Sequence, residues 1–291
     1  MARFIDPRVD WAFKRIFGSE DTKECLITFL NGLFEDELVI KDVTFAKTEK
    51  LGLRPDDRGV VFDVYCITNE GKHVIVEMQK KEQEYFADRA LYYTARAIVQ
   101  QGIRGIWDYH LAPVYTVCFM DFVSQSPILK EFRTDLVLTD LQTRQRVSDR
   151  MRIVYLQLPL FDKHTEAECM DIFDCWIYIV KNMNMFEQMP FSEKYPVFRK
   201  LAEIGDLRKL SREELELYDE DIKNMRDIYA TRKFDEKKGM EIGMAKGMEK
   251  GMAKGMAKGM AKGMEKEKLA TARRLLSMGL SDEQVSTATE L

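Results

Sequence analysis

Acidic and amide side chains interrupt two neighbouring apolar runs of the sequence. Asp63 stands inside residues 60–68, and Glu77 and Gln79 stand inside residues 72–80. Both runs are rich in β-branched and aromatic residues, so we expect them to form β-strands. A carboxylate in a buried strand loses solvation, and it persists there only when a proton, a cationic side chain or a metal ion compensates it. Two such carboxylates, with water and substrate phosphate oxygens, suit Mg²⁺.

The three residues between the runs, Asn-Glu-Gly, predict a β-hairpin whose loop ends in Gly71 in the left-handed conformation. With that loop, Thr68 pairs with Lys72, and Asp63 lies opposite Glu77 on the same face. Facing residues have Cβ atoms roughly 4.5–5.5 Å apart. A two-residue loop would send Glu77 to the other face, so the pairing of the carboxylates depends on the loop length.

The alternative interpretation of the two acidic residues is a solvated edge of the hairpin. Asp63 is flanked by apolar residues on both sides of the strand, namely Val61, Phe62, Val64 and Tyr65. A strand that is apolar on both faces is typical of a central, buried position. The flanks therefore favour a buried carboxylate pair without excluding the edge.

Several segments resemble a known family, in this order along the chain: FIDPRVDWAFKRIFG, LITFLNGLF, FDVYCITNEGKHVIVEMQK, YFADRALYYTARAI and LAPVYTVCFMDF. An Asp followed fourteen residues later by Glu on the next strand is similar to the motif of the PD-(D/E)XK nuclease superfamily. The closer resemblance is to the recombination-promoting nuclease (Rpn) family of PD-(D/E)XK nuclease family transposases. It covers roughly residues 1–235.

The resemblance implies an α/β fold with a restriction-endonuclease-like core, α-β-β-β-α-β around a mixed sheet, followed by a C-terminal helical region and a repeat tail. It also implies metal-dependent cleavage of DNA, with Asp63 and Glu77 as ligands of Mg²⁺ or Mn²⁺. A third acidic ligand commonly comes from the N-terminal helix, where Asp10 is the candidate; Glu49 is another.

Gln79 stands where the superfamily has a Lys, although Glu-x-Gln is usual within the closer family. A Lys would orient or deprotonate the attacking water and stabilise phosphate charge, whereas a Gln orients water but supplies no charge. Lys81, two residues further along the same face, would compensate for it. The expected catalytic set is Asp63, Glu77, Gln79 and Lys81.

The predicted helix over residues 85–101 places Arg89, Tyr93 and Arg96 on one face. We expect this row to contact DNA phosphates, since Arg binds them bidentately. The alternative is a solvated amphipathic face. A second basic cluster, Arg144, Arg146, Arg150 and Arg152, is more typical of a charged loop between strands than of a DNA-facing hairpin.

The pattern of the chain predicts four segments. Residues 1–160 form the nuclease-like core, 161–235 a helical extension, 236–268 a linker or helix of Gly-Met-x-Lys repeats, and 269–291 a helical pair broken near Gly279. Met, Ala and Lys favour a helix in the repeats, but each Gly costs about 1 kcal/mol relative to Ala. The repeats are either an arm that joins copies of the chain into a homo-oligomer or a linker without a specific role.

Composition limits the class of protein. Residues 236–291 carry 11 Lys and Arg against 8 Asp and Glu, whereas the other residues carry 34 against 41. An acidic body lacks a global attraction for nucleic acid, so DNA contact needs a local basic patch. The 5 Cys include no CxxC and are typical of reduced thiols. No apolar run could span a membrane, and the first residues lack a signal-peptide pattern, so we expect a cytoplasmic protein without a membrane partner.

These observations predict a Mg²⁺-dependent DNA endonuclease that hydrolyses phosphodiester bonds and acts in recombination, transposition or other processes of mobile DNA. The alternative is a catalytically weak or inert member of the same fold that binds DNA or assembles through its tail. The Gln at position 79 and the acidic body favour this alternative.

Overall fold

The computed structural model describes residues 3–35, 37–50 and 59–290. The chain divides into two compact units, Met1–Lys223 and Asn224–Leu291. Among the described residues, the strands all belong to the first unit, and the second unit is helical. The two units are described in turn.

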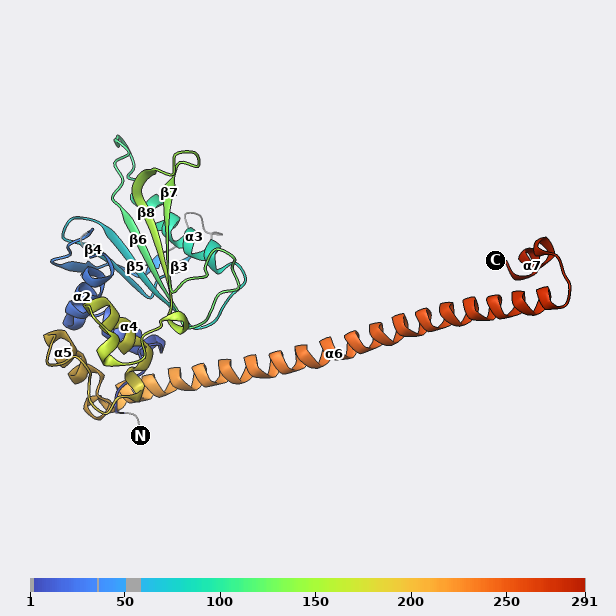
Figure 1. The fold of residues 1–291 in the computed structure, drawn as a ribbon. Helices are drawn as coiled ribbons and strands as arrows, with labels where there is room; N and C mark the ends of the chain where they lie inside the picture. Colours follow the sequence, from blue (N-terminus) through green and yellow to red (C-terminus); the bar gives the residue numbers. More distant parts are fainter. Residues whose placement is uncertain (1–2, 36, 51–58, 291) are drawn as a thin grey trace. The chain divides into compact units, whose positions relative to one another are not determined.

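A six-stranded mixed sheet forms the centre of the first unit (Figure 1). The first three strands in spatial order pair antiparallel, the next two join in parallel, and the last is antiparallel again. In that order the strands are β1 (Val43–Phe45), β4 (Val64–Thr68), β5 (His73–Gln79), β6 (Val114–Met120), β8 (Arg146–Gln157) and β7 (Arg133–Thr139). A separate antiparallel pair consists of β2 (Glu49–Lys50) and β3 (Val60–Val61).

Helices cover the two faces of this sheet. The first unit contains the α-helices α1 (Asp10–Phe17), α2 (Lys23–Leu33), α3 (Phe86–Val99), α4 (Ile172–Asn182) and α5 (Pro196–Gly205). Short 3₁₀ turns are η1 (Glu20–Thr22), η2 (Leu158–Leu160), η3 (Glu166–Glu168), η4 (Met183–Met185) and η5 (Leu207–Lys209). The N-terminal helices are broken at Gly18, since α1 ends at Phe17 and η1 separates it from α2.

The alternation of side chains along β6 shows why the sheet is covered on both sides. Phe119 packs against α1 and α2, with its ring 5.7 Å from Phe13 and 5.0 Å from Phe29. Its neighbours Cys118 and Met120 point the other way and join the cluster that contains Phe86 of α3. Successive side chains of a strand face opposite sides, so an all-apolar strand is a central one.

The predicted fold class is confirmed, because the order α2-β1-β4-β5-α3-β6 reproduces α-β-β-β-α-β around a mixed sheet. The strand expected over 60–68 differs in one respect, since it is interrupted between Val61 and Val64. The part before the break pairs with β2 and the part after it pairs with β1 and β5. Asp63 therefore lies at a break between two pieces of strand.

The helix α6 (Arg212–Ser277) begins in the first unit, and its first turns hold α1 there. The backbone N–H of Trp11 donates to Asp221 at 2.8 Å, and the backbone N–H of Asp6 donates to the Tyr218 hydroxyl at 2.9 Å. Arg15 forms an ion pair with Glu214. These contacts tie the N-terminal segment to a part of the chain about 200 residues later.

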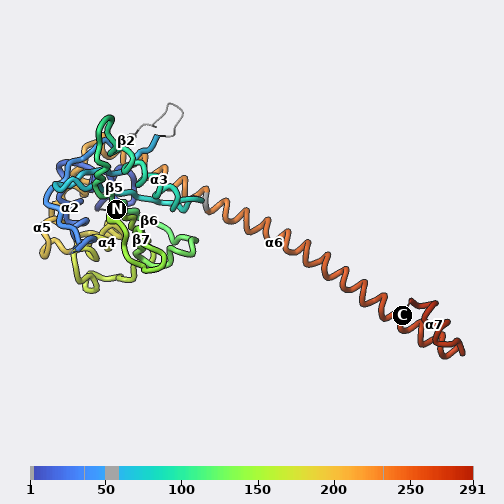
Figure 2. Tube along the Cα trace, turned by 90° about the horizontal axis from the view of Figure 1, so that it is seen from above, coloured from blue at the N-terminus to red at the C-terminus, as the bar shows by residue number. Residues whose placement is uncertain are grey.

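The second unit contains the Gly-Met-x-Lys repeats, which continue α6 without a break (Figure 2). The repeat Met side chains are exposed, and no other atoms lie within 4 Å of a Cβ added at the repeat glycines. Residues 269–277 form the end of α6. Gly279 has φ +88°, and α7 (Asp282–Thr289) follows with a capping box of Ser281 and Gln284. Among the described residues, no helix combines the length and apolar character needed to cross a membrane.

Candidate nuclease site

The β4–β5 hairpin has the predicted register. Its pairs run from Ile67 opposite His73 to Val64 opposite Val76. The loop has three residues and closes with bonds from the Gly71 N–H to the Thr68 carbonyl at 2.8 Å and from Thr68 to Lys72 at 2.9 Å. Gly71 has φ +76°, the conformation that a glycine adopts without strain. One step beyond the last backbone pair, this register sets Asp63 opposite Glu77.

Beyond the last backbone pair of the hairpin, the Asp63 and Glu77 side chains link the two strands by hydrogen bonds. The N–H of Met78 donates to Asp63 Oδ2 at 2.8 Å, and the N–H of Asp63 donates to Glu77 Oε1 at 3.2 Å. Each carboxylate thus binds the backbone of the opposite strand through one oxygen. Glu77 is only 6% exposed. The alternative of a solvated hairpin edge therefore does not describe Glu77, and Asp63 is half-buried.

Both carboxyls are held in surroundings that disfavour their charge. Burial raises the pKa of Glu77 well above its usual range, and the negative charge of Asp63 raises it further. Burial also raises the pKa of Asp63, while the N–H of Met78 opposes that rise. The positive charges of Arg89 and Lys14 lower the pKa of both carboxyls. A bound cation would relieve the same repulsion.

The helix α1 brings Asp10 and Lys14 to the carboxylate pair. Lys14 Nζ lies 2.8 Å from Asp10 Oδ2, and the negative charge of Asp10 raises the pKa of Asp63. Burial lowers the pKa of Lys14, but the hydrogen bond and charge of Asp10, together with Asp63, raise it overall. Glu49, the other expected third ligand, belongs to β2 and pairs with Val61 outside the six-stranded sheet.

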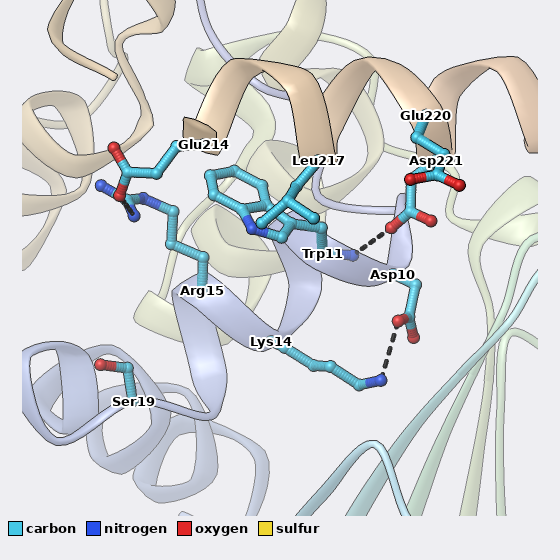
Figure 3. Close-up of a pocket in the computed structure, with 9 residues that line it drawn as sticks. All are labelled: Asp10, Trp11, Lys14, Arg15, Ser19, Glu214, Leu217, Glu220 and Asp221. Carbon is cyan, nitrogen blue, oxygen red and sulfur yellow. Dashed lines mark hydrogen bonds and ion pairs between the residues drawn. The ribbon is translucent and has the colours of Figure 1, made fainter. Parts of the chain in front are cut away.

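A pocket of about 380 Å³ lies between α1 and the first turns of α6 (Figure 3). The Trp11 ring lies beneath Leu217 of α6, whereas Asp10 and Lys14 point toward one another on another side of α1. The lining residues are Asp10, Trp11, Lys14, Arg15, Ser19, Glu214, Leu217, Glu220 and Asp221. The start of α6 therefore fixes the helix that carries Asp10 and Lys14.

Gln79 ends β5, and both ends of its side-chain amide have partners. Its Nε2 donates to the Lys81 carbonyl at 2.9 Å, and its Oε1 accepts from Arg89 Nη2 at 2.6 Å. The Lys81 side chain is exposed beyond the end of the strand. Arg89 comes from α3, so the amide joins the end of the strand to the helix that covers it.

The row of Arg89, Tyr93 and Arg96 on α3 faces protein rather than open solvent. Tyr93 packs against Phe62, with ring centroids 5.6 Å apart, and Arg96 is buried at 6% exposure. In the basic cluster of the β7–β8 hairpin, Arg152 is also buried and binds Asp135. Of the expected DNA-contacting residues, Arg89 is the one whose side chain reaches the carboxylate hairpin through Gln79.

Comparison of the chain with protein-family models identifies the family to which it belongs. The family model described as PD-(D/E)XK nuclease family transposase matches residues 7–233. The chain belongs to this family. No curated protein gives a significant match, and no solved structure does. The resemblance read from the sequence motifs is thereby confirmed.

The donor set fits the divalent metal that PD-(D/E)XK nucleases generally use. Asp63 and Glu77 each keep one carboxylate oxygen without a hydrogen bond from a described residue. The described residues contain no group of three or more His, Cys, Asp or Glu that could hold a metal ion. A cation here would complete its shell with water and substrate oxygens, as Mg²⁺ does when one or two carboxylates hold it.

Sequence reasoning missed two features of this family member's site. Lys14 was overlooked, although its spacing of four residues from Asp10 places both on one face of a helix. The contact of Arg89 with Gln79 left no signal in the sequence, because it depends on how α3 packs over the end of β5.

Proposed function

We propose that this protein is a Mg²⁺-dependent endonuclease that hydrolyses phosphodiester bonds of DNA and serves recombination or transposition of mobile DNA. Mn²⁺ would substitute for Mg²⁺. The observation that carries the proposal is the Asp63–Glu77 pair across the end of the β4–β5 hairpin, with Glu77 buried and Asp63 half-buried, in a chain of the PD-(D/E)XK nuclease family transposases.

In this proposal Asp63 and Glu77 hold the metal, and Asp10 joins them from α1. Bound Mg²⁺ would act as a Lewis acid on the phosphate and favour deprotonation of a water. The attacking water gives up a proton to solvent and its oxygen forms a bond to phosphorus. The bond from phosphorus to the leaving oxygen breaks, and the leaving oxygen takes up a proton from solvent. Burial of the carboxylates makes their attraction for a cation stronger than it would be in water.

Gln79, Lys81 and the α3 row complete the proposed site. Gln79 holds the Arg89 guanidinium at the end of β5, and Lys81 adds a positive charge there. Of the α3 row, half-buried Arg89 is the residue that we expect to reach the DNA backbone, while Tyr93 and the buried Arg96 support that face of the helix from within the protein. Phosphate contacts of this kind position DNA without reading its sequence.

A second candidate function is DNA binding or assembly without cleavage. Three observations favour it: no group of three possible metal-binding side chains occurs among the described residues, Gln79 replaces a charged residue, and the tail exposes a row of Met. In this candidate the tail joins copies of the chain into a homo-oligomer.

Plasmid nicking tests the proposal. We expect nicking with Mg²⁺, none with EDTA, and a loss of at least about 100-fold for Asp63→Ala, because a removed metal ligand disables the site. Glu84→Ala, which changes an exposed carboxylate before α3, serves as the control. Nicking that survives both chelation and Asp63→Ala would refute the mechanism.

Calorimetric titration with Mg²⁺ separates the two candidate functions. Binding that is lost in Asp63→Ala supports the nuclease. Intact DNA binding without any metal binding at millimolar concentrations supports the module that does not cleave.

A further inference from the structure

Three positive groups lie around the carboxylate hairpin, and their partners distinguish them. Lys14 Nζ is 2.8 Å from the Asp10 carboxylate, so its charge is already neutralised by an ion pair. Lys81 is exposed beyond the end of β5. Arg89 binds only neutral amides through its hydrogen bonds, those of Gln79 at 2.6 Å and Gln83 at 2.7 Å. Of the three, Arg89 is therefore the one that hydrogen bonds hold in place and that forms no ion pair with a carboxylate among the described residues.

The guanidinium of Arg89 is held on several sides. Gln79 and Gln83 fix its two terminal nitrogens, and the group lies 5.9 Å from the centre of the Phe86 ring and 5.4 Å from that of Tyr93. These hydrogen bonds use two of the five N–H donors of an Arg. A guanidinium fixed in this way loses little further entropy when it binds a phosphate.

Arg89 is also close enough to act on the carboxylate pair. Its charge lowers the pKa of both Asp63 and Glu77. Gln79 links the two parts, since it lies two residues after Glu77 on the same face of β5 and accepts from Arg89. The Gln79 side chain thus holds the Arg89 guanidinium next to the position where the superfamily motif has a Lys.

We propose that Arg89 supplies the positive charge that a strand Lys supplies elsewhere in the superfamily, and that Gln79 is its positioning residue. The proposal rests on the nuclease function proposed above. Arg89 would bind a non-bridging oxygen of the scissile phosphate and stabilise the charge that grows on it as the water attacks. An Arg stays protonated, so it takes no proton from the water.

Combining Gln79→Lys with Arg89→Gln tests whether Arg89 supplies the positive charge and Gln79 positions it. In single-turnover cleavage with Mg²⁺ we expect Arg89→Gln to be slower by about 100-fold or more, as for the loss of one charge-stabilising donor. Arg89→Lys should recover part of that loss. In the Gln79→Lys background, Arg89→Gln should cost less than about tenfold, because the introduced Lys supplies the charge. Arg104→Gln, in the exposed loop after α3, is the matched control.

A titration with Mn²⁺ gives a readout that does not depend on cleavage. Removal of a positive charge beside two carboxylates should tighten Mn²⁺ binding by roughly threefold to tenfold at pH 8 in Arg89→Gln. A merely structural role would loosen Mn²⁺ binding or leave it unchanged, and either result overturns the proposal. So does a full loss from Arg89→Gln in the Gln79→Lys background. A wild-type chain that binds Mn²⁺ but cleaves no DNA refutes the nuclease function and with it the role of Arg89 in cleavage. A chain that cleaves DNA but shows the full loss in Arg89→Gln with Gln79→Lys refutes the role of Arg89 alone.

Discussion

Asp63 and Glu77 oppose the stability of the fold that holds them. Burial raises the pKa of both carboxyls, and the charge of Asp63 adds to the effect on Glu77. At a pH where both are ionised, the folded chain therefore contains a repulsion that the unfolded chain lacks. Function-bearing residues commonly impose such a cost, and their replacement commonly increases stability.

Glu77→Gln should raise the melting temperature of the metal-free protein at pH 8, by about 3 °C or more. A raised pKa means that the folded state keeps a proton that the unfolded chain releases. Wild-type stability therefore falls as the pH rises from the ordinary carboxyl range through the raised pKa, and the variant lacks the contribution of Glu77 to this fall. Circular dichroism melts between pH 4 and pH 9 measure the difference.

Mg²⁺ provides the complementary measurement. It should raise the melting temperature of the wild type, because it binds the folded state, and should not raise that of Glu77→Gln. Glu84→Gln removes an exposed carboxylate and should behave like the wild type. A melting temperature of Glu77→Gln below that of the wild type at every pH would contradict the argument.

The residues of the hairpin could be predicted from the sequence, and those around it could not. The position of Asp63 opposite Glu77 follows from strand alternation and a three-residue loop, which are both local. The pairing of Arg89 with Gln79 depends on the packing of α3 over the sheet. Local sequence patterns do not predict how α3 packs over the sheet, so the sequence identifies Arg89 only as one residue of a helix face.

At the scale of elements, α1 depends on the beginning of α6. The N–H of Trp11 is one of the donors that a helix start leaves without an intrahelical partner, and Asp221 accepts it at 2.8 Å. An acidic side chain at this end also interacts favourably with the helix dipole. The cap comes from a different helix, so it fixes both the end of α1 and its position.

Asp221→Ala should destabilise the first unit by about 1 kcal/mol, the usual cost of a lost N-terminal cap. It should also slow cleavage, because Asp10 and Lys14 are carried by the helix that loses its cap. Denaturant unfolding and single-turnover cleavage measure the two effects. Glu220→Ala, one residue earlier and exposed, should change neither. Equal effects of the two substitutions would show that the cap is unimportant.

The repeat glycines weaken α6 and pack against no other part of the described chain, because no atoms beyond the chain neighbours and the local helix backbone lie within 4 Å of a Cβ added to them. Replacement of Gly251, Gly255 and Gly259 by Ala should stabilise the helix by about 1 kcal/mol per site. Thermal melts of the full chain at 222 nm should show helix persisting to higher temperature. Gly279→Ala should have the opposite effect, since φ there is +88°.

At the scale of the whole molecule, the first unit includes residues well beyond the sheet. The Phe17 ring of α1 lies 5.5 Å from Trp176 of α4, and Phe4 forms a bridge with Asp206. The helical extension therefore shares a hydrophobic core with the N-terminal helices. Helix periodicity predicted its helices. The segment boundary predicted at residue 160 rests on the local change from a strand pattern to a helical pattern, which carries no information about long-range packing.

A chain that ends at residue 235 should keep the melting temperature and cleavage rate of the full protein. Its first unit retains Glu214, Tyr218 and Asp221, whose contacts fix the N-terminal segment. A chain that ends at residue 211 loses all three and should melt at a lower temperature. Light scattering on the same samples gives their mass in solution, and a smaller number of chains per particle after removal of residues 236–291 would assign assembly to the tail. Equal melting temperatures for the two truncated chains would contradict the structural role of these contacts.

The period of the repeat in α6 has a geometric consequence. Each block of four residues adds about 6 Å of helix and turns everything after it by about 40° around the helix axis. Within the second unit, gain or loss of one block would therefore shift α7 along the axis of α6 and rotate it relative to the residues that precede the repeats. Because the blocks are nearly identical, the length of this segment is a parameter that insertion or deletion can adjust in uniform steps, with no new side chain to accommodate.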